Sequence, residues 1–532
     1  MTELSRRELL ERAAYTAGLA GAASILPADF LLQQAAAAKR SKLPSPSQMP
    51  IDHFVVVMME NRSFDHYFGW LGQTGLADGL QNATYLDPEG NPVATQHASS
   101  MGVAEWQGCG HPDPGHGWDA GRAQFRDGFL AADSGNDEFA LTYYNEGELG
   151  FIHDAAKAYT IYDRWFCSQL GPTWPNRYYK WSGQSGGKNN NTPPVDTAGN
   201  QWETIFDVAL RSDVTARYYN SDLPFSATFG ARGASWTRPL AEYYADAATG
   251  QLPNITFVDP PFRDGGGFDG NSADEHPHGD VRLGQAWMAD VVRAFVESPN
   301  YERGALFVIY DEWGGFFDHV APPSVPDDRQ SANLDEDFGQ MGFRIPAVTI
   351  SPYTRNLSSD PVRVGHGQYG TESILKLIMY RFGLDFDRTR ADAAPTRVDN
   401  ANNVGESFNW KKPDFERPDL PDPEHVASKP CVTGGGDLLD SESASAHVSD
   451  LAELEELAFR FGFTASDGKP HELFRKPDSV RKAIAPRASL PASCWLRRPP
   501  VAVTAGFARS KSELSGASLA CGRARAACRR WL

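Results

Sequence analysis

The chain has 532 residues, enough for a large core and for more than one domain, and its 41% apolar and 22% charged residues are typical of a globular protein. Its net charge of −18 is unevenly spread, since removing the +1 of residues 1–40 and the +8 of residues 487–532 leaves −27 on residues 41–486. So acidic a body argues against nucleic-acid binding, and no pattern indicates an obligate protein partner.

Residues 1–40 have the order of parts of a twin-arginine export signal. Arg6 and Arg7 precede an apolar segment at 13–26 and an alanine-rich stretch at 35–38. An amphipathic terminal helix is the alternative, and the apolar segment is too short to cross a bilayer core of about 30 Å. We therefore expect an exported protein that is secreted, periplasmic or associated with the cell wall, with any membrane contact peripheral.

The cysteines are mostly far apart and form no CxxC metal pattern. In an oxidising compartment some of them could pair, and the sequence leaves the partners open. They are Cys109, Cys167, Cys431, Cys494, Cys521 and Cys528.

An unbroken apolar run follows the Pro/Ser-rich linker at 41–50 and stops abruptly at Glu60 and Asn61. A run without alternation predicts a strand buried on both faces of a parallel sheet. Ligands of such sheets bind beyond the carboxyl ends of the strands, which is where Glu60 and Asn61 lie. The alternative is that Asn61 caps a helix beginning at Arg62.

The next chemically suggestive residues lie in loops. A polar, glycine-rich region places His116 among turn-forming residues at 109–118. Mixed helical and strand-like spacing from Phe151 ends at a Gly-Pro break before Thr173. We expect Thr173 on a loop with an arginine nearby, a setting that suits a nucleophile, although such a threonine more often bonds the turn backbone.

The pattern of the first strand recurs at residues 305–310, another apolar run, which Asp311 and Glu312 follow directly. Two buried strands thus deliver oxygen-bearing side chains to one edge of a sheet. The surrounding elements alternate, and this predicts a layered α/β/α sandwich. Expected strands are 252–260 and 347–351, and expected helices include the one before Pro299 and 372–382, which Gly383 ends.

The composition predicts four parts. After the signal, residues 41–400 form the catalytic domain, and residues 401–486 form an irregular extension with one amphipathic helix near 448–461. Residues 487–532 are basic, and we expect a disordered tail there, with a surface-binding segment as the alternative.

Four segments together carry a resemblance to a known family. They are IDHFVVVMMENRSFDHYFG at 51–69, GPTWPNR at 171–177, DEHP at 274–277 and YDEWGGFFDHVAPP at 310–323. In this combination the chain resembles the bacterial phosphoesterase family that contains secreted phospholipases C and a related acid phosphatase, a branch of the alkaline-phosphatase-like superfamily.

The resemblance implies a divalent metal ion and a threonine nucleophile, Thr173. The implied metal ligands are Glu60, Asn61, Asp311, Glu312 and Thr173 itself. His116 and His276 would contact the phosphoryl oxygens or serve the leaving group, and His319 is a further candidate. Oxygen ligands favour a hard ion such as Mg, Mn or Ca.

For the substrate we expect a phosphodiester lipid of the phosphatidylcholine type, cleaved as by a phospholipase C. A diester carries one negative charge, so it needs fewer cationic groups than a phosphomonoester, and the motifs supply only Arg62 and Arg177. An acid phosphatase is the first alternative. A serine esterase using Gly-Gln-Ser-Gly-Gly at 183–187 and a calcium-binding protein are the others.

Overall fold

The computed structural model describes residues 42–463, except for 197, 263–271, 391, 394, 429–430 and 432–441. The predicted export signal at 1–40 and the basic tail at 487–532 lie outside the described residues, as does the extension beyond 463. Among the described residues, no helix combines the length and the apolar character that a membrane span requires.

An eight-stranded sheet lies at the centre of the described chain, in the order β12-β6-β11-β10-β1-β9-β7-β8. β1 lies between β9 and β10 and is parallel to both, with His53 opposite Gly304 and Met59 opposite Tyr310. β11 is antiparallel to β10 and β6, so the sheet is mixed. The strands are β1 (His53–Met59), β6 (Thr160–Tyr162), β7 (Ala216–Asn220), β8 (Thr237–Pro239), β9 (Ile255–Asp259), β10 (Gly304–Tyr310), β11 (Ala347–Ile350) and β12 (Arg363–Gly365).

Two smaller ribbons lie outside this sheet. β2 (Thr84–Leu86) pairs with β3 (Pro92–Ala94), and β4 (Gln96–His97) pairs with β5 (Thr142–Tyr143). Every residue of β10 is buried, and β1 is buried from its second residue on. This burial on both faces is what an unbroken apolar run predicts.

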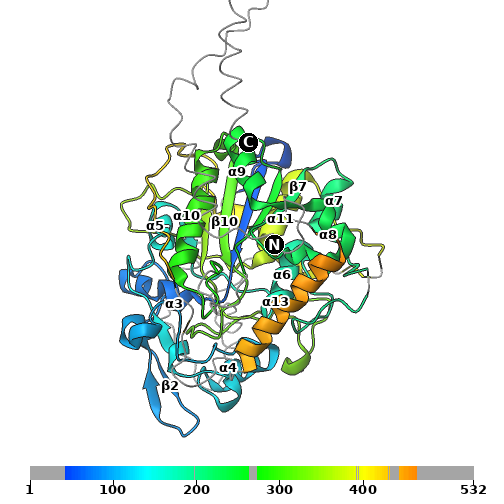
Figure 1. Cartoon of the computed structure of the whole chain (residues 1–532). Coiled ribbons are helices and arrows are strands. Elements are labelled where there is room, and N and C mark those ends of the chain that lie inside the picture. The colour runs from blue at the N-terminus through cyan, green and yellow to red at the C-terminus, as the bar shows by residue number, and fades with distance from the viewer. Residues whose placement is uncertain are drawn as a thin grey trace, which may run out of the picture. The chain divides into compact units, whose positions relative to one another are not determined.

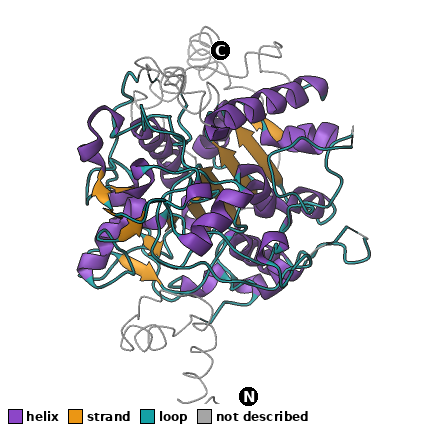
Figure 2. Ribbon diagram, turned by 90° about the horizontal axis from the view of Figure 1, so that it is seen from below, coloured by secondary structure: helices purple, strands orange, loops and turns teal. Residues whose placement is uncertain are grey.

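Helices flank the strands on both sides (Figures 1 and 2), so the predicted layered α/β architecture is confirmed. α10 packs on α9, and α11 packs on α6 and α12. The helices are α3 (Phe64–Phe68), α4 (Trp118–Asp127), α5 (Ile152–Ala158), α6 (Thr173–Ser182), α7 (Ile205–Leu210), α8 (Gly230–Trp236), α9 (Leu240–Thr249), α10 (Val281–Glu297), α11 (Thr371–Phe382), α12 (Thr396–Asn400) and α13 (Glu442–Arg460).

One local prediction was wrong, and one alternative is excluded. Thr173 is not a loop residue, because it is the first residue of α6, a helix that is buried along its whole length. Asn61 does not cap a helix, because α3 begins at Phe64 and the Ser63 side chain accepts the capping bond from the His66 N–H. Thr173 and Asn61 are both polar but buried, so their polarity does not indicate an exposed loop.

The extension contacts the rest of the described chain at several places. A disulfide joins Cys109 to Cys431, and α13 packs against the 3₁₀ helix η7 (Phe225–Phe229). Cys167 is a buried free thiol.

Candidate functional site

The two pairs of polar side chains that follow the predicted strands meet at one edge of the sheet. Glu60 and Asn61 follow β1, and Asp311 and Glu312 follow its parallel neighbour. The Asp311 N–H donates to the Met59 carbonyl at 3.0 Å, and the Asn61 N–H donates to Asp311 Oδ1 at 3.2 Å. All four side chains are buried, so the structure brings both pairs together in the protein interior.

The turns after these strands have backbone conformations that few residues adopt. Asn61 has a φ of +58°, in the left-handed region. Gly314 has a φ of +64°, and a Cβ built on it would lie 2.2 Å from the Asn61 carbonyl oxygen. The Gly314 N–H donates to Glu312 Oε2 at 2.7 Å. Glycine here lets the strand ends approach closely and orients a candidate ligand.

Arg177 ties α6 to the strand ends. Its Nη2 lies 2.8 Å from Glu60 Oε1 and its Nε lies 3.4 Å from Asp311 Oδ2. Its Nη1 lies 3.2 Å from Asp259, the last residue of β9. One guanidinium therefore contacts the ends of three neighbouring strands and brings the start of α6, with Thr173, to the same edge.

Asn176 holds the chain segment that leads into Thr173. Its side-chain Nδ2 donates to the carbonyls of Gln169, Gly171 and Pro172 at 3.1, 2.8 and 3.1 Å. Its Oδ1 accepts from the Gln169 N–H at 2.9 Å. The Pro-Asn-Arg sequence thus has a structural reason: the asparagine shapes the turn and the arginine anchors the helix.

The five predicted metal ligands share one property. Each has one buried side-chain oxygen for which the described part of the protein supplies no hydrogen bond: Glu60 Oε2, Asn61 Oδ1, Thr173 Oγ1, Asp311 Oδ2 and Glu312 Oε1. A buried polar atom left unsatisfied costs about 1–3 kcal/mol. Carboxylate, amide and hydroxyl oxygens are the donors that hard divalent cations prefer. These donor types therefore suit a divalent metal ion. The carboxylates of Glu60, Asp311 and Glu312 do not all lie within 4.8 Å of one another in the structure, whereas the ligand atoms of the neighbouring Asp113, His116 and His276 do.

The charge balance favours a cation here as well. Burial raises the pKa of Glu60 and of Glu312 well above the ordinary value, and the Asp311 charge raises both further. Burial also raises the pKa of Asp311, against the opposing charge of Arg177. One guanidinium offsets only part of the cost of ionising three buried carboxylates, and a bound cation would offset the rest.

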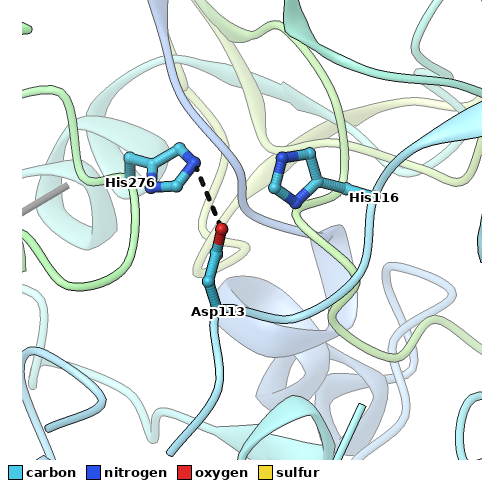
Figure 3. A group of neighbouring side chains, drawn as sticks. All are labelled: Asp113, His116 and His276. Atoms are coloured by element: carbon cyan, nitrogen blue, oxygen red, sulfur yellow. Dashed lines mark ion pairs between the residues drawn. The ribbon is translucent and has the colours of Figure 1, made fainter. Parts of the chain in front are cut away.

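A second group, formed by Asp113, His116 and His276, adjoins these residues. Figure 3 shows the three side chains pointing into one space, with His276 Nε2 3.8 Å from Asp113 Oδ2. His116 Nδ1 donates to the Pro114 carbonyl at 2.7 Å, which leaves Nε2 for its contact with Asn61 Nδ2 at 3.3 Å. Both predicted histidines are thus beside the strand ends.

Asp113 is a site residue that the sequence reasoning missed. Its carboxylate is buried, and neither oxygen receives a hydrogen bond from the described residues. Burial raises the pKa of Asp113 well above its ordinary value, and burial lowers the pKa of His116 to about 4. The only sequence signal was an acid between two prolines shortly before His116.

Arg62 has a different role from the one expected. Its Nε and Nη2 donate to the Glu275 carbonyl at 2.9 and 2.5 Å, so it holds the backbone next to His276 rather than providing charge for a substrate. Glu275 itself has a φ of +75°, and its side chain accepts bonds from the hydroxyls of Tyr67 and Tyr310.

His319 lies in another cluster. Its Nδ1 bonds Asp65 and its Nε2 bonds Asp78 at 3.1 Å, and Arg344 contacts Asp65 at 3.0 Å from the other side. Both ring nitrogens are therefore engaged in an ion-pair network, and the structure does not join His319 to the strand-end group.

The serine-esterase alternative does not fit the structure. Ser185 comes two residues after Gly183, which ends α6, so a helix and not a strand precedes it. The Ser185 hydroxyl is buried and donates to the Lys188 carbonyl at 2.9 Å. A nucleophile elbow needs a strand before the serine and an exposed hydroxyl.

Comparison with known proteins gives consistent matches. A model described as the Phosphoesterase family matches residues 51–385. The chain is 32% identical to non-specific phospholipase C1 of Arabidopsis thaliana over 59% of this chain and 63% of that protein. It is 29% identical to non-specific phospholipase C6 of the same plant over 58% of this chain and 62% of that protein. The chain thus spans less than two thirds of the length of these two relatives.

Phospholipase C B of Mycobacterium tuberculosis is 30% identical over 71% of this chain and 82% of that protein. Among solved structures, a protein in the alkaline phosphatase superfamily from Vibrio parahaemolyticus is similar with a TM-score of 0.33 and 9% identity, over 71% of this chain and 78% of that chain.

Proposed function

This chain belongs to the Phosphoesterase family, and on that premise we propose that it is an exported, metal-dependent phospholipase C that cleaves phosphatidylcholine-type phosphodiesters through Thr173. The observation that carries the proposal is the set of five buried oxygens, from two strand ends and one helix start, that lack hydrogen bonds from the described residues. The names of the relatives, all phospholipases C, support the same reaction class.

The metal would be held by Glu60, Asn61, Thr173, Asp311 and Glu312. A divalent ion bound there supplies positive charge that favours the deprotonated Thr173 hydroxyl and offsets charge developing on the phosphoryl oxygens. Thr173 is also the first residue of α6, and the N-terminal end of a helix dipole favours negative charge.

The reaction then proceeds in two steps. Thr173 Oγ1 forms a bond to phosphorus while the bond from phosphorus to the glycerol oxygen breaks, and diacylglycerol leaves after gaining a proton. Water next cleaves the phosphothreonine, which releases the phosphorylated headgroup and restores the hydroxyl. His116, whose Nε2 is unprotonated, would take the Thr173 proton and pass it to the leaving glycerol oxygen, and His276 would contact the phosphoryl oxygens.

The charges around the site favour a diester over a monoester. Arg177 is engaged with carboxylates and Arg62 with a backbone carbonyl, so neither motif arginine is available to a phosphate dianion. The net charge of the chain, −18, would attract a cationic headgroup such as choline. The Cys109–Cys431 disulfide supports export, because disulfides persist in oxidising compartments.

The deciding experiment compares kcat/KM for a choline phosphodiester with kcat/KM for an aryl phosphate monoester, each with and without chelator. We expect the diester to be preferred and the activity to vanish with chelator and return with a divalent ion. A clear preference for the monoester would identify an acid phosphatase, and activity that ignores chelator would refute metal dependence.

A matched variant tests the ligand set. Asp311→Ala should lose both the bound metal, measured by elemental analysis of the purified protein, and turnover, while its circular dichroism stays that of the wild type. Full metal content in this variant would show that the ligand assignment is wrong.

A further inference from the structure

Helix α13 lies in the C-terminal extension, yet it is linked by hydrogen bonds to the start of α6. Asp450 Oδ2 accepts from Asn191 Nδ2 at 2.6 Å. Asn191 Oδ1 in turn accepts from the Trp174 N–H at 2.8 Å. Trp174 directly follows Thr173, so Asp450, which lies 277 positions after Thr173, is two hydrogen bonds away from the backbone N–H of the residue next to the proposed nucleophile.

The start of α6 needs such a partner. The first N–H groups of a helix have no acceptor within the helix, and a side chain at the N-cap position usually supplies one. Pro172 stands at that position in α6 and has no side-chain acceptor to offer. Asn191 provides the acceptor from outside the helix, and Asp450 fixes the orientation of the Asn191 amide.

Packing brings α13 to the same place. Leu454 and Leu457 of α13 are buried, and the helix packs against η7. Phe225 of η7 lies edge-on to the Trp174 ring, with 5.8 Å between ring centroids. Figure 1 draws α13 in orange. α13 is therefore linked to Trp174 in two ways. One link runs through Asn191 to the Trp174 backbone N–H, and the other runs through η7 and Phe225 to the Trp174 ring.

We propose that Asp450 and Asn191 are positioning residues that fix the first turn of α6, so that Thr173 Oγ1 is held in place for attack on phosphorus. The extension then contributes to catalysis, because Asp450 of α13 helps to position Thr173. This inference rests on the proposed function for its kinetic consequence, but the hydrogen-bonded link and its effect on α6 do not depend on the substrate.

The kinetic test uses three variants of the full chain. Asp450→Ala removes the acceptor and should lower kcat by about tenfold to hundredfold with KM within twofold, as expected when a reacting group is slightly misplaced. Asp450→Asn keeps an oxygen acceptor and should restore most of kcat. Glu456→Ala, which breaks an exposed pair with Arg460 on the same helix, is the control and should leave kcat within twofold.

A second readout is independent of catalysis. Hydrogen exchange measured on the α6 peptide should be faster at the Trp174 amide in Asp450→Ala than in the wild type and in Glu456→Ala. If Asp450→Ala does not fold, Asn191→Ala removes the same link from the loop side and should give the same two changes.

Unchanged exchange, or a kcat within twofold of wild type in a folded Asp450→Ala, would overturn the inference. A wild-type protein that hydrolyses no phosphoester would refute the proposed function instead, and the exchange result would still decide whether Asp450 orders the start of α6.

Discussion

Thr173 occupies the first turn of α6, and its hydroxyl oxygen is buried without a hydrogen bond from the described residues. A structural threonine at a turn would bond the backbone, so this hydroxyl is available for chemistry. Thr173→Ser keeps the hydroxyl and should retain appreciable kcat/KM toward the diester. Thr173→Val keeps the shape and should lose several orders of magnitude, because the nucleophile is gone.

The two variants control for each other, since both preserve the start of the helix. Their thermal unfolding should match that of the wild type within a few degrees. Near-normal turnover by Thr173→Val would mean that water attacks phosphorus directly.

The His319 network makes stability depend on pH. Burial alone would lower the pKa of His319, but the charges and hydrogen bonds of Asp65 and Asp78 outweigh it and raise the pKa to about 9. The unfolded value is about 6.5, so the stabilisation is fully present below pH 6.5 and is lost as the pH rises through 9. At 1.36 kcal/mol per pKa unit the effect is about 3 kcal/mol.

Urea unfolding of wild type and of His319→Gln at pH 6 and at pH 9.5 measures this effect. The difference in unfolding free energy between the two proteins should shrink by about 3 kcal/mol at the higher pH. A difference that stays constant over this range would show that His319 is not protonated in the folded protein.

At the scale of elements, the site forms where β1 and β10 end and α6 begins. β1 and β10 run in register over their full length, and Arg177 of α6 contacts the residues that follow both. The turn after β10 is the tightest part of this arrangement, because Gly314 lies against the Asn61 carbonyl.

Gly314→Ala should therefore damage the site more than a glycine substitution with the same backbone strain elsewhere. Gly383, which ends α11, has the same φ of +64°, but a Cβ there meets nothing within 4 Å. Gly383→Ala should cost about 1–2 kcal/mol of stability, because alanine disfavours the left-handed conformation, and should leave turnover intact. Gly314→Ala should cost about 1–3 kcal/mol more and lose metal binding, because the Asn61 turn must move.

Chemical unfolding, metal analysis and kcat/KM of the two glycine variants make the comparison. Equal stability loss and equal turnover in both would mean that the approach of Gly314 to Asn61 is not needed for the site.

At the scale of the whole molecule, the disulfide closes a very long loop. Cys109 precedes the loop that carries Asp113 and His116, and Cys431 lies 322 residues later in the extension. Cross-links that close long loops restrict the unfolded chain most, and removal of a native disulfide typically costs 2–5 kcal/mol. Reduction, or the Cys109→Ser variant, should therefore lower Tm by several degrees.

Peptide mapping after alkylation checks the pairing first. Without reductant, denatured protein should leave Cys109 and Cys431 unlabelled, whereas Cys167 should be labelled. Labelling of Cys431 in the unreduced protein would contradict the bond, and an unchanged Tm after its reduction would contradict the stabilisation.

Local patterns in the sequence were sufficient for the elements. The apolar runs ending at Glu60 and Asp311 predicted β1 and β10, because burial on both faces removes alternation from a strand. The apolar face before Pro299 and the glycine at 383 likewise predicted α10 and α11 with nearly correct ends. These signals are short-range, so they can be read without knowing the fold.

Only the tertiary structure decided which side chains meet. Asp113 pairs with His276, 163 residues later in the chain. Arg177 contacts Glu60, 117 residues earlier, and Asp311, 134 residues later. None of these pairs produces a periodic pattern in the sequence that would reveal it. The helical state of Thr173 and the separation of His319 from the site also escaped prediction, because polar side chains buried among charged partners look like exposed loop residues in sequence. The positions of these side chains are set by strand register and by burial, and both depend on the whole sheet and on the helices packed on it.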